Sequence, residues 1–107
     1  MMEENAFLEF VGDTPATRLL DFFITGREFD YTLTELSKKA GVSWATLYRL
    51  FPHFLKAEVF IEVRRVGRAK LYKINMANPL VKKLVDFHDS VLLAELKKVE
   101  KGLLVEA

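Results

Sequence analysis

The chain has 107 residues, half of them apolar and 29% charged with a formal net charge of +1, which is the composition of one globular domain rather than of a disordered segment. Because the sequence has no cysteine and only two histidines, disulfides and cysteine-ligated metal centres are excluded, and we expect neither a metal site nor a cofactor. No apolar stretch approaches the roughly 18 residues of a membrane span, and the start lacks the basic residues of a signal peptide, so we expect a cytoplasmic protein without a membrane partner.

The charges are unevenly distributed along the chain. Residues 1–37 hold two bases against eight acids, residues 38–73 hold nine bases against two acids, and residues 74–107 hold five of each. The basic middle third is therefore the first candidate for a surface that contacts an anionic polymer such as nucleic acid. The alternative is that these bases are scattered over a solvated surface.

The N-terminal part predicts one short element and one helix. Residues 6–11 are mostly apolar, and their pattern fits an edge strand or a helical arm. Thr14-Pro15 is typical of a helix start, because the threonine hydroxyl accepts from an unpaired amide and proline has no amide hydrogen to leave unpaired. Gly26 is predicted to end this helix. The broad apolar face of the helix comprises Leu19, Leu20, Phe22, Phe23 and Ile24.

Two further helices are predicted on either side of a tight turn. Thr32 and Glu35 have the spacing of a capping box, and Gly41 lies where the turn requires a positive φ angle. Ser43 is the predicted cap of the next helix, and Pro52 predicts either a kink or a separate short turn near its end. Five apolar residues, with the small Ser37 between the helices, fall at the positions that a helix-turn-helix buries: Leu36, Ala40, Val42, Leu47 and Leu50.

The helix after the turn is predicted to leave a polar and aromatic face outside the core. Side chains of these kinds at the start of a helix can read base edges and bind phosphates. Trp44 has two interpretations, since the indole either stacks on sugar or methyl groups or packs internally. The alternative for the whole segment is an ordinary helical hairpin without a ligand. The predicted exposed face comprises Ser43, Trp44, Thr46, Tyr48, Arg49 and His53.

The hydrophobic period then changes to that of β-strands. Residues 59–65 and 70–75 are rich in β-branched and aromatic side chains, and Gly67 lies between them, which predicts a β-hairpin. Bases near the tip favour contact with phosphates, although hairpin tips also carry bases for solubility and edge protection. The expected apolar faces are Ile61 and Val63 on the first strand and Tyr72 and Ile74 on the second. The bases are Arg64, Arg65, Arg68 and Lys70.

A final helix is predicted from Asn78-Pro79 to about Lys101, with Gly102 as its stop. Its apolar residues form two stripes, one of them reaching Leu103, and together these are wider than one small domain can cover. We therefore expect a twofold homodimer formed through either face, the alternative being a helix packed back on its own domain. His88 is expected to be buried or at the rim. The predicted interface comprises Leu80, Val81, Leu84, Val85, Phe87, His88, Val91, Leu92, Leu96 and Val99.

Three segments resemble a known family. GVSWATLYRLFPHF and VFIEVRRVGRAKLYKINMANPLVKKLVDF resemble winged helix-turn-helix transcriptional regulators that are abundant in archaea and related to the MarR- and ArsR-like superfamily. The opening FLEFVGDTPATRLLDFF is also similar, so the resemblance covers about residues 6–90. It implies a fold that is mainly α with a small β-hairpin (α+β). Residues 1–76 would form the DNA-binding domain, and residues 77–107 a long C-terminal dimerisation helix in the same compact unit.

The same resemblance implies how the parts would contact DNA. It implies an N-terminal arm at residues 1–12, a recognition helix at about 43–54 and a wing at about 59–75. In that family the recognition helix enters the major groove and the wing lies along the flanking backbone or minor groove. The residues implied at the groove are Ser43, Trp44, Thr46, Tyr48 and Arg49, and those implied on the wing are Arg64, Arg65, Arg68 and Lys70.

No arrangement of residues predicts catalysis, because the acids are isolated and no phosphate loop, nucleophile elbow or metal-ligand spacing occurs. We therefore expect a sequence-specific regulator of transcription, not an enzyme, that binds double-stranded DNA as a homodimer at an inverted repeat. A small-molecule effector bound among the nine phenylalanines has no further support in the sequence. The alternative function is a winged-helix adaptor for protein interactions in a transcription or replication assembly.

Overall fold

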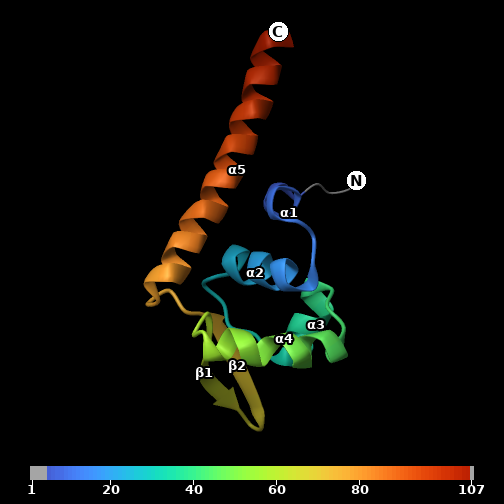
Figure 1. Ribbon diagram of the computed structural model, residues 1–107, viewed down its shortest axis with the longest axis vertical. Coiled ribbons are helices and arrows are strands. Elements are labelled where there is room, and N and C mark those ends of the chain that lie inside the picture. The colour runs from blue at the N-terminus through green and yellow to red at the C-terminus, as the bar shows by residue number, and fades with distance from the viewer. Residues whose placement is uncertain (1–4, 107) are drawn as a thin grey trace.

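The computed structural model describes residues 5–106, with side chains described as far as Gly102. Three helices and a hairpin form a body, from which the long helix α5 leads away with α1 beside it (Figure 1). The fold is α+β, mainly helical with one antiparallel hairpin, as the sequence predicts. The elements are α1 (Ala6–Val11), α2 (Pro15–Thr25), α3 (Leu33–Ala40), α4 (Trp44–Lys56), β1 (Phe60–Val66), β2 (Ala69–Ile74) and α5 (Pro79–Glu106).

The described part of the predicted N-terminal arm is helical. Asn5 caps α1 by accepting a hydrogen bond from the backbone amide of Leu8 at 3.0 Å, so the strand alternative is wrong. Phe7 is buried, and its ring lies 4.7 Å from the ring of His88 in α5. The remainder of the arm, residues 1–4, and the side chain of Leu103 lie outside the described residues.

Side-chain caps start α2, α3 and α4 at the residues that the sequence indicates. Thr14 accepts from an amide in the first turn of α2 at 3.1 Å, and Thr32 accepts from the amide of Glu35 at 3.2 Å. The Glu35 carboxylate in turn accepts from the amide of Thr32 at 2.9 Å, which completes the predicted capping box. Ser43 caps α4 through the amide of Thr46 at 3.3 Å. These bonds need only neighbouring residues, which is why the three helix starts are predictable.

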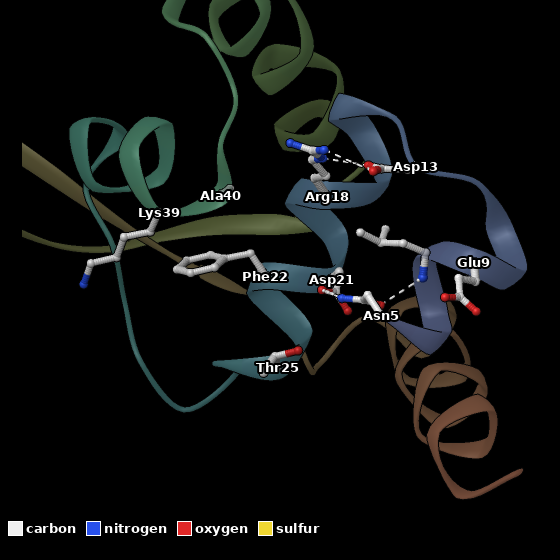
Figure 2. A pocket seen from close by; sticks show the side chains of 10 residues that line it. Asn5, Glu9, Asp13, Arg18, Asp21, Phe22, Thr25, Lys39 and Ala40 are labelled. Atoms are coloured by element: carbon white, nitrogen blue, oxygen red, sulfur yellow. Dashed lines mark hydrogen bonds and ion pairs between the residues drawn. The ribbon is translucent and has the colours of Figure 1, made fainter. Parts of the chain in front are cut away.

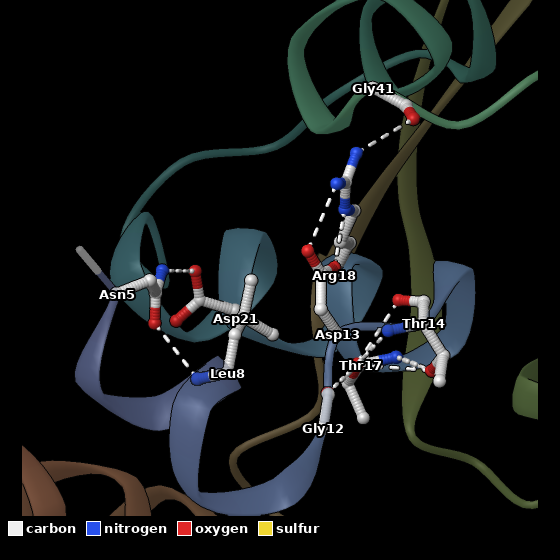
Figure 3. A network of polar contacts seen from close by, with 9 residues as sticks. All are labelled: Asn5, Leu8, Gly12, Asp13, Thr14, Thr17, Arg18, Asp21 and Gly41. Atoms are coloured by element: carbon white, nitrogen blue, oxygen red, sulfur yellow. Dashed lines mark hydrogen bonds and ion pairs between the residues drawn. The ribbon is translucent and has the colours of Figure 1, made fainter. Parts of the chain in front are cut away.

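The turn between α3 and α4 is held from both sides. Gly41 has a φ of +70° and a ψ of +38°, the left-handed conformation predicted for it. The Ser37 hydroxyl donates to the carbonyl of Val42 at 2.7 Å. From α2, Arg18 reaches the Gly41 carbonyl at 3.5 Å, while Asp13 holds the same guanidinium at 2.6 Å (Figure 3). The direction in which α4 leaves the turn is therefore set by both preceding helices.

Helix α4 buries a single stripe against the aromatic core. Leu47 and Phe51 are buried, and the Phe51 ring lies 5.5 Å from the ring of Phe60 in β1. Phe60 stacks on Phe23 of α2 with ring centroids 3.9 Å apart. Side chains on the opposite side of α4 cannot reach this core. All five residues predicted to be inside around the turn are buried or half-buried: Leu36, Ala40, Val42, Leu47 and Leu50.

Helix α4 runs without interruption through Pro52, so the separate short turn is wrong. Pro52 lies on the exposed side, where water can solvate the carbonyl that loses its partner. After the helix, Glu58 has a φ of +59°. The side-chain amides of Asn75 and Asn78 donate to the Glu58 carbonyl at 3.0 and 3.1 Å, which holds this turn in place.

The hairpin confirms the predicted strands but corrects one of their faces. Tyr72 and Ile74 are buried as expected, whereas Ile61 and Val63 are 36% and 42% exposed. The inward residue of β1 is instead Phe60, and a bulge between Glu62 and Arg64 interrupts the alternation at Val63. Because both faces of β1 carry apolar residues, alternation by itself does not decide which face is inward.

One apolar stripe of α5 is covered at its start and uncovered further along. The residues of this stripe recur at intervals of four, three and four positions, which is a repeat of 11 residues in three turns, or 3.67 residues per turn. A stripe with this repeat stays on one face of a nearly straight helix. Val85 and His88 are 3% and 1% exposed, whereas Leu92 and Leu96 are 40% and 63% exposed. The stripe comprises Val81, Val85, His88, Leu92, Leu96 and Val99.

Three residues assigned to a dimer interface belong to the chain's own core. Val81, Val85 and His88 are buried because α1 and α2 cover the first half of α5. Nε2 of His88 lies 2.9 Å from a carboxylate oxygen of Asp21 in α2, and that carboxylate also accepts from the side-chain amide of Asn5 at 2.8 Å. For this half of the helix, packing on its own domain is the correct alternative.

Helix α5 does not stop at Gly102 but continues to Glu106, for 28 residues in all. Gly102 does not take a positive φ, and a glycine inside a helix costs only about 1 kcal/mol relative to alanine. Neither α5 nor any other helix within the described residues is long and apolar enough to cross a membrane.

Substitution Gly41→Ala should lower the free energy of unfolding by about 1–2 kcal/mol, because alanine resists a positive φ. Its Cβ would also lie 3.3 Å from Nη1 of Arg18. Urea denaturation followed by circular dichroism measures the change. Gly102→Ala is the control, since it has open space around its Cβ and should leave stability unchanged or raise it slightly. Equal losses in the two variants would contradict the importance of the turn.

Candidate nucleic-acid interface

Helix α4 and the hairpin, which carry the predicted contact residues, lie at the end of the molecule opposite the free end of α5 (Figure 1). The outward face of α4 is open to solvent. Thr46 is half-buried, and its backbone amide and its hydroxyl both bond the Ser43 cap. The other predicted residues of this helix are exposed: Ser43, Trp44, Tyr48, Arg49 and His53.

Trp44 and Tyr48 form a stacked pair on this face. They are one helical turn apart, with ring centroids 5.2 Å apart and an angle of 28° between the planes. Trp44 is 42% exposed and Tyr48 is 65% exposed, so the indole faces outward and the internal packing alternative is wrong. Arg49 follows directly, and no ion pair of the described side chains engages it. The start of α4 therefore presents an exposed aromatic pair next to a guanidinium that no described acid engages.

Two of the four bases predicted on the hairpin are bound to acids. Arg64 donates to both carboxylate oxygens of Asp30, from Nε at 2.6 Å and from Nη2 at 3.2 Å. Arg65 donates to Glu62 at 2.7 Å. All of these groups are partly solvated, and exposed ion pairs are worth only about 0–1 kcal/mol, so another anion can replace the acid at little cost. The sequence shows no local signal for the Arg64 pair, because 34 positions separate its members.

Of the other two bases, Arg68 lies in the turn of the hairpin and Lys70 lies on β2, opposite Arg65. Arg68 and Lys70 are exposed, and neither belongs to an ion pair among the side chains of residues 5–102. Together with Thr32 and Thr34 at the start of α3, they line a shallow hollow. Of the four hairpin bases, these two can bind an anion without first breaking an ion pair with an acid.

A short backbone bridge attaches the hairpin to the helices. The amide of Tyr31 donates to the carbonyl of Tyr72 at 2.9 Å, and the amide of Tyr72 donates back at 2.8 Å. Asp30, the partner of Arg64, directly precedes this bridge. The bridge therefore holds β2 beside the start of α3, so that the hairpin has a defined position relative to α4. Sequence patterns do not reveal it, because it joins single residues far apart in the chain.

The ion pairs shift the pKa values of both acids downward. Hydrogen bonds from Arg64 lower the pKa of Asp30, and those from Arg65 lower the pKa of Glu62, in each case outweighing partial desolvation. Because the folded-state pKa lies below the unfolded value, each pair stabilises the fold at neutral pH. That contribution is lost as the pH falls from about 4 through the lowered pKa.

A groove of about 570 Å³ between α1, α2 and the end of α3 is a second place where a ligand could bind (Figure 2). Four of its polar side chains already bond in pairs, since Asp13 holds Arg18 and Asp21 accepts from Asn5. No buried side-chain polar atom of the described residues lacks a partner, and none of their acids and histidines gather into a metal site. The groove thus adds nothing in favour of an effector.

The remaining residues of the predicted dimer interface lie on the surface of α5. Leu84 and Val91 are half-buried, and the others are exposed. Beside them, Phe10 of α1 packs edge-on against Phe87 at 5.4 Å and remains 69% exposed. The uncovered part of α5 and the neighbouring α1 thus form one apolar surface. The exposed predicted residues are Leu80, Phe87, Leu92, Leu96 and Val99.

The amino-acid sequence matches neither a protein-family model nor a curated protein.

Substitution Arg64→Ala should raise the pKa of Asp30 toward the ordinary aspartate range, because it removes the main cause of the lowering. Carboxyl ¹³C shifts followed against pH by NMR measure this change. The pKa of Glu62 should stay low in the same variant, because its partner is Arg65. Arg68→Ala is the matched control, and both acids should keep their lowered values. An unchanged Asp30 in Arg64→Ala would show that the pair does not form in solution.

Proposed function

We propose that this chain is a winged helix-turn-helix regulator of transcription that binds double-stranded DNA as a homodimer. In this proposal α3 and α4 are the helix-turn-helix, α4 is the recognition helix, and the hairpin is the wing. The outward face of α4 carries the proposal: Trp44, Tyr48 and Arg49 are exposed on a helix whose opposite stripe is locked in the core. Readout of the major groove requires such a face on a rigid helix.

Each exposed side chain of α4 has chemistry suited to one type of contact. Arg49 can donate two hydrogen bonds to O6 and N7 of guanine, the commonest specific contact in the major groove. Tyr48 lies beside it and reaches the bases or the adjacent backbone. Ser43 at the helix N-terminus and His53 near the other end are placed to contact phosphates on either side.

The wing supplies the non-specific part of the affinity. Arg68 and Lys70 bind phosphates directly, whereas Arg64 and Arg65 must first exchange their acids for phosphate. Replacing a weak exposed pair is favourable, because phosphate contacts also release counterions from the DNA. Asp30 and Glu62 therefore reduce non-specific binding without preventing contact at a well-fitted site.

The uncovered part of α5 is the proposed dimer interface. Leu96 and Val99 are 63% and 54% exposed, and they continue the stripe that is covered earlier in the helix. A hollow lined by Ala6, Leu92 and Leu96 lies beside them, between α1 and α5. The α5 helix of a second copy would cover both, and its twofold symmetry would place the two α4 helices about 34 Å apart on an inverted repeat.

The double substitution of Arg68→Ala with Lys70→Ala should reduce the slope of log K against log salt by about 1.8, because two phosphate contacts are lost. Anisotropy of a labelled duplex, titrated at several salt concentrations, measures the slope. The matched control replaces Lys82 and Lys83, which are exposed on α5, and should keep the original slope. If the unaltered protein binds no duplex even at low salt, DNA binding is wrong and the adaptor alternative is favoured.

The double substitution of Leu96→Glu with Val99→Glu should convert the dimer into a folded monomer, because it places two like charges in the apolar interface. Analytical ultracentrifugation measures the mass, and circular dichroism checks the fold. Lys97→Glu changes the net charge by the same amount on the opposite side of α5 and should remain dimeric. Dissociation of both proteins would indicate a general charge effect, and a monomeric unaltered protein would contradict the interface.

A further inference from the structure

We propose that the stacked pair of Trp44 and Tyr48 recognises the C5 methyl group of thymine, so that the operator half-site carries thymine opposite this pair. The inference rests on the proposed DNA-binding function and specifies what that site reads. The two rings lie next to each other, four residues apart, at the start of the helix that would enter the groove. In recognition helices this part contacts base edges rather than the backbone alone.

The geometry favours an apolar contact over a hydrogen bond. With planes 28° apart and centroids 5.2 Å apart, the rings stabilise each other and form one continuous apolar surface in the free protein. Apolar groups that are exposed side by side are typical of interaction sites, whereas singly exposed ones are ordinary. Because the stack already orders both side chains, little conformational entropy remains to be lost on binding.

Only one feature of the major groove complements such a surface. Guanine, cytosine and adenine present donors and acceptors there, whereas thymine adds a methyl group at C5. An aromatic face in contact with a polar base edge would desolvate that edge without replacing its hydrogen bonds. Burial of the thymine methyl against the two rings instead removes apolar area from water on both partners. Arg49, the next residue along α4, is left to read a neighbouring guanine.

The test compares an alternating dA-dT duplex with an alternating dA-dU duplex, which differ only in the C5 methyl group. Every register of the first presents thymine methyls, so the test does not require the operator to be known. Removal of one contacted methyl should weaken binding about fourfold, the ratio expected for burying one carbon-sized apolar group, and more if several are contacted. Anisotropy of the labelled duplex gives the affinities. Trp44 is the single tryptophan of the sequence, so its fluorescence reports contact with the pair directly.

Two variants assign the effect to the stack. Trp44→Ala should bind both duplexes with equal affinity, because the surface that senses the methyl is gone. Arg49→Ala should keep the preference for dA-dT whatever its effect on the overall affinity, since neither duplex contains the guanine that Arg49 would read. Circular dichroism confirms that each variant is folded.

The outcomes separate this inference from the function on which it rests. Equal affinity of the unaltered protein for the two duplexes, with normal salt-dependent binding, overturns the methyl contact and leaves DNA binding intact. A preference that survives Trp44→Ala in a folded protein also overturns it. Absence of binding to either duplex at low salt overturns both proposals together.

Discussion

The structure depends on the burial of one narrow stripe of α4. Leu47 and Phe51 are buried against an aromatic cluster in which Phe60 of the hairpin stacks on Phe23 of α2. This contact joins helices and hairpin in one core, and it determines which side of α4 can face solvent. Since Gly41 sets the direction of the helix at its other end, α4 has little freedom to roll. The outward position of its aromatic and basic residues is a consequence of this packing.

Most features that depend on neighbouring residues were predictable, although Gly102 does not end α5, and the features missed elsewhere depend on distant residues. The caps at Thr14, Thr32 and Ser43 and the turn at Gly41 follow from side-chain chemistry within a few positions, and the structure confirms them. The exposed face of α4 followed from the same local periodicity. Whether Ile61 faces inward depends on where the rest of the core lies. Helical periodicity indicated that α5 has a wide apolar surface, but not that its own domain covers half of it.

The electrostatics of the hairpin illustrate a limit of charge counting. Nine bases in the middle third of the chain suggested a strongly positive surface, yet Asp30 reaches Arg64 from the acidic first third. The charge that is immediately accessible at the tip comes from Arg68 and Lys70. In the proposed function, this arrangement would lower the affinity for non-specific DNA more than the affinity for the operator, where every contact fits. Asp30 and Glu62 would then compete with DNA phosphates for the two arginines.

Helix α5 is continuous from the core to its uncovered part, and this continuity has a mechanical consequence. At 1.5 Å per residue its 28 residues extend for about 42 Å, with no proline after the first position to act as a joint. In a dimer of the proposed kind, the two α5 helices would cross at the interface, and each would move as a rigid rod together with the domain that carries α4. A small change in their crossing angle would be magnified at the far end into a change in the separation of the two α4 helices. A molecule that binds between α1 and α5 would then change the distance between the two α4 helices, and with it the half-site spacing that the dimer fits. It would do so without contacting the residues that face the DNA.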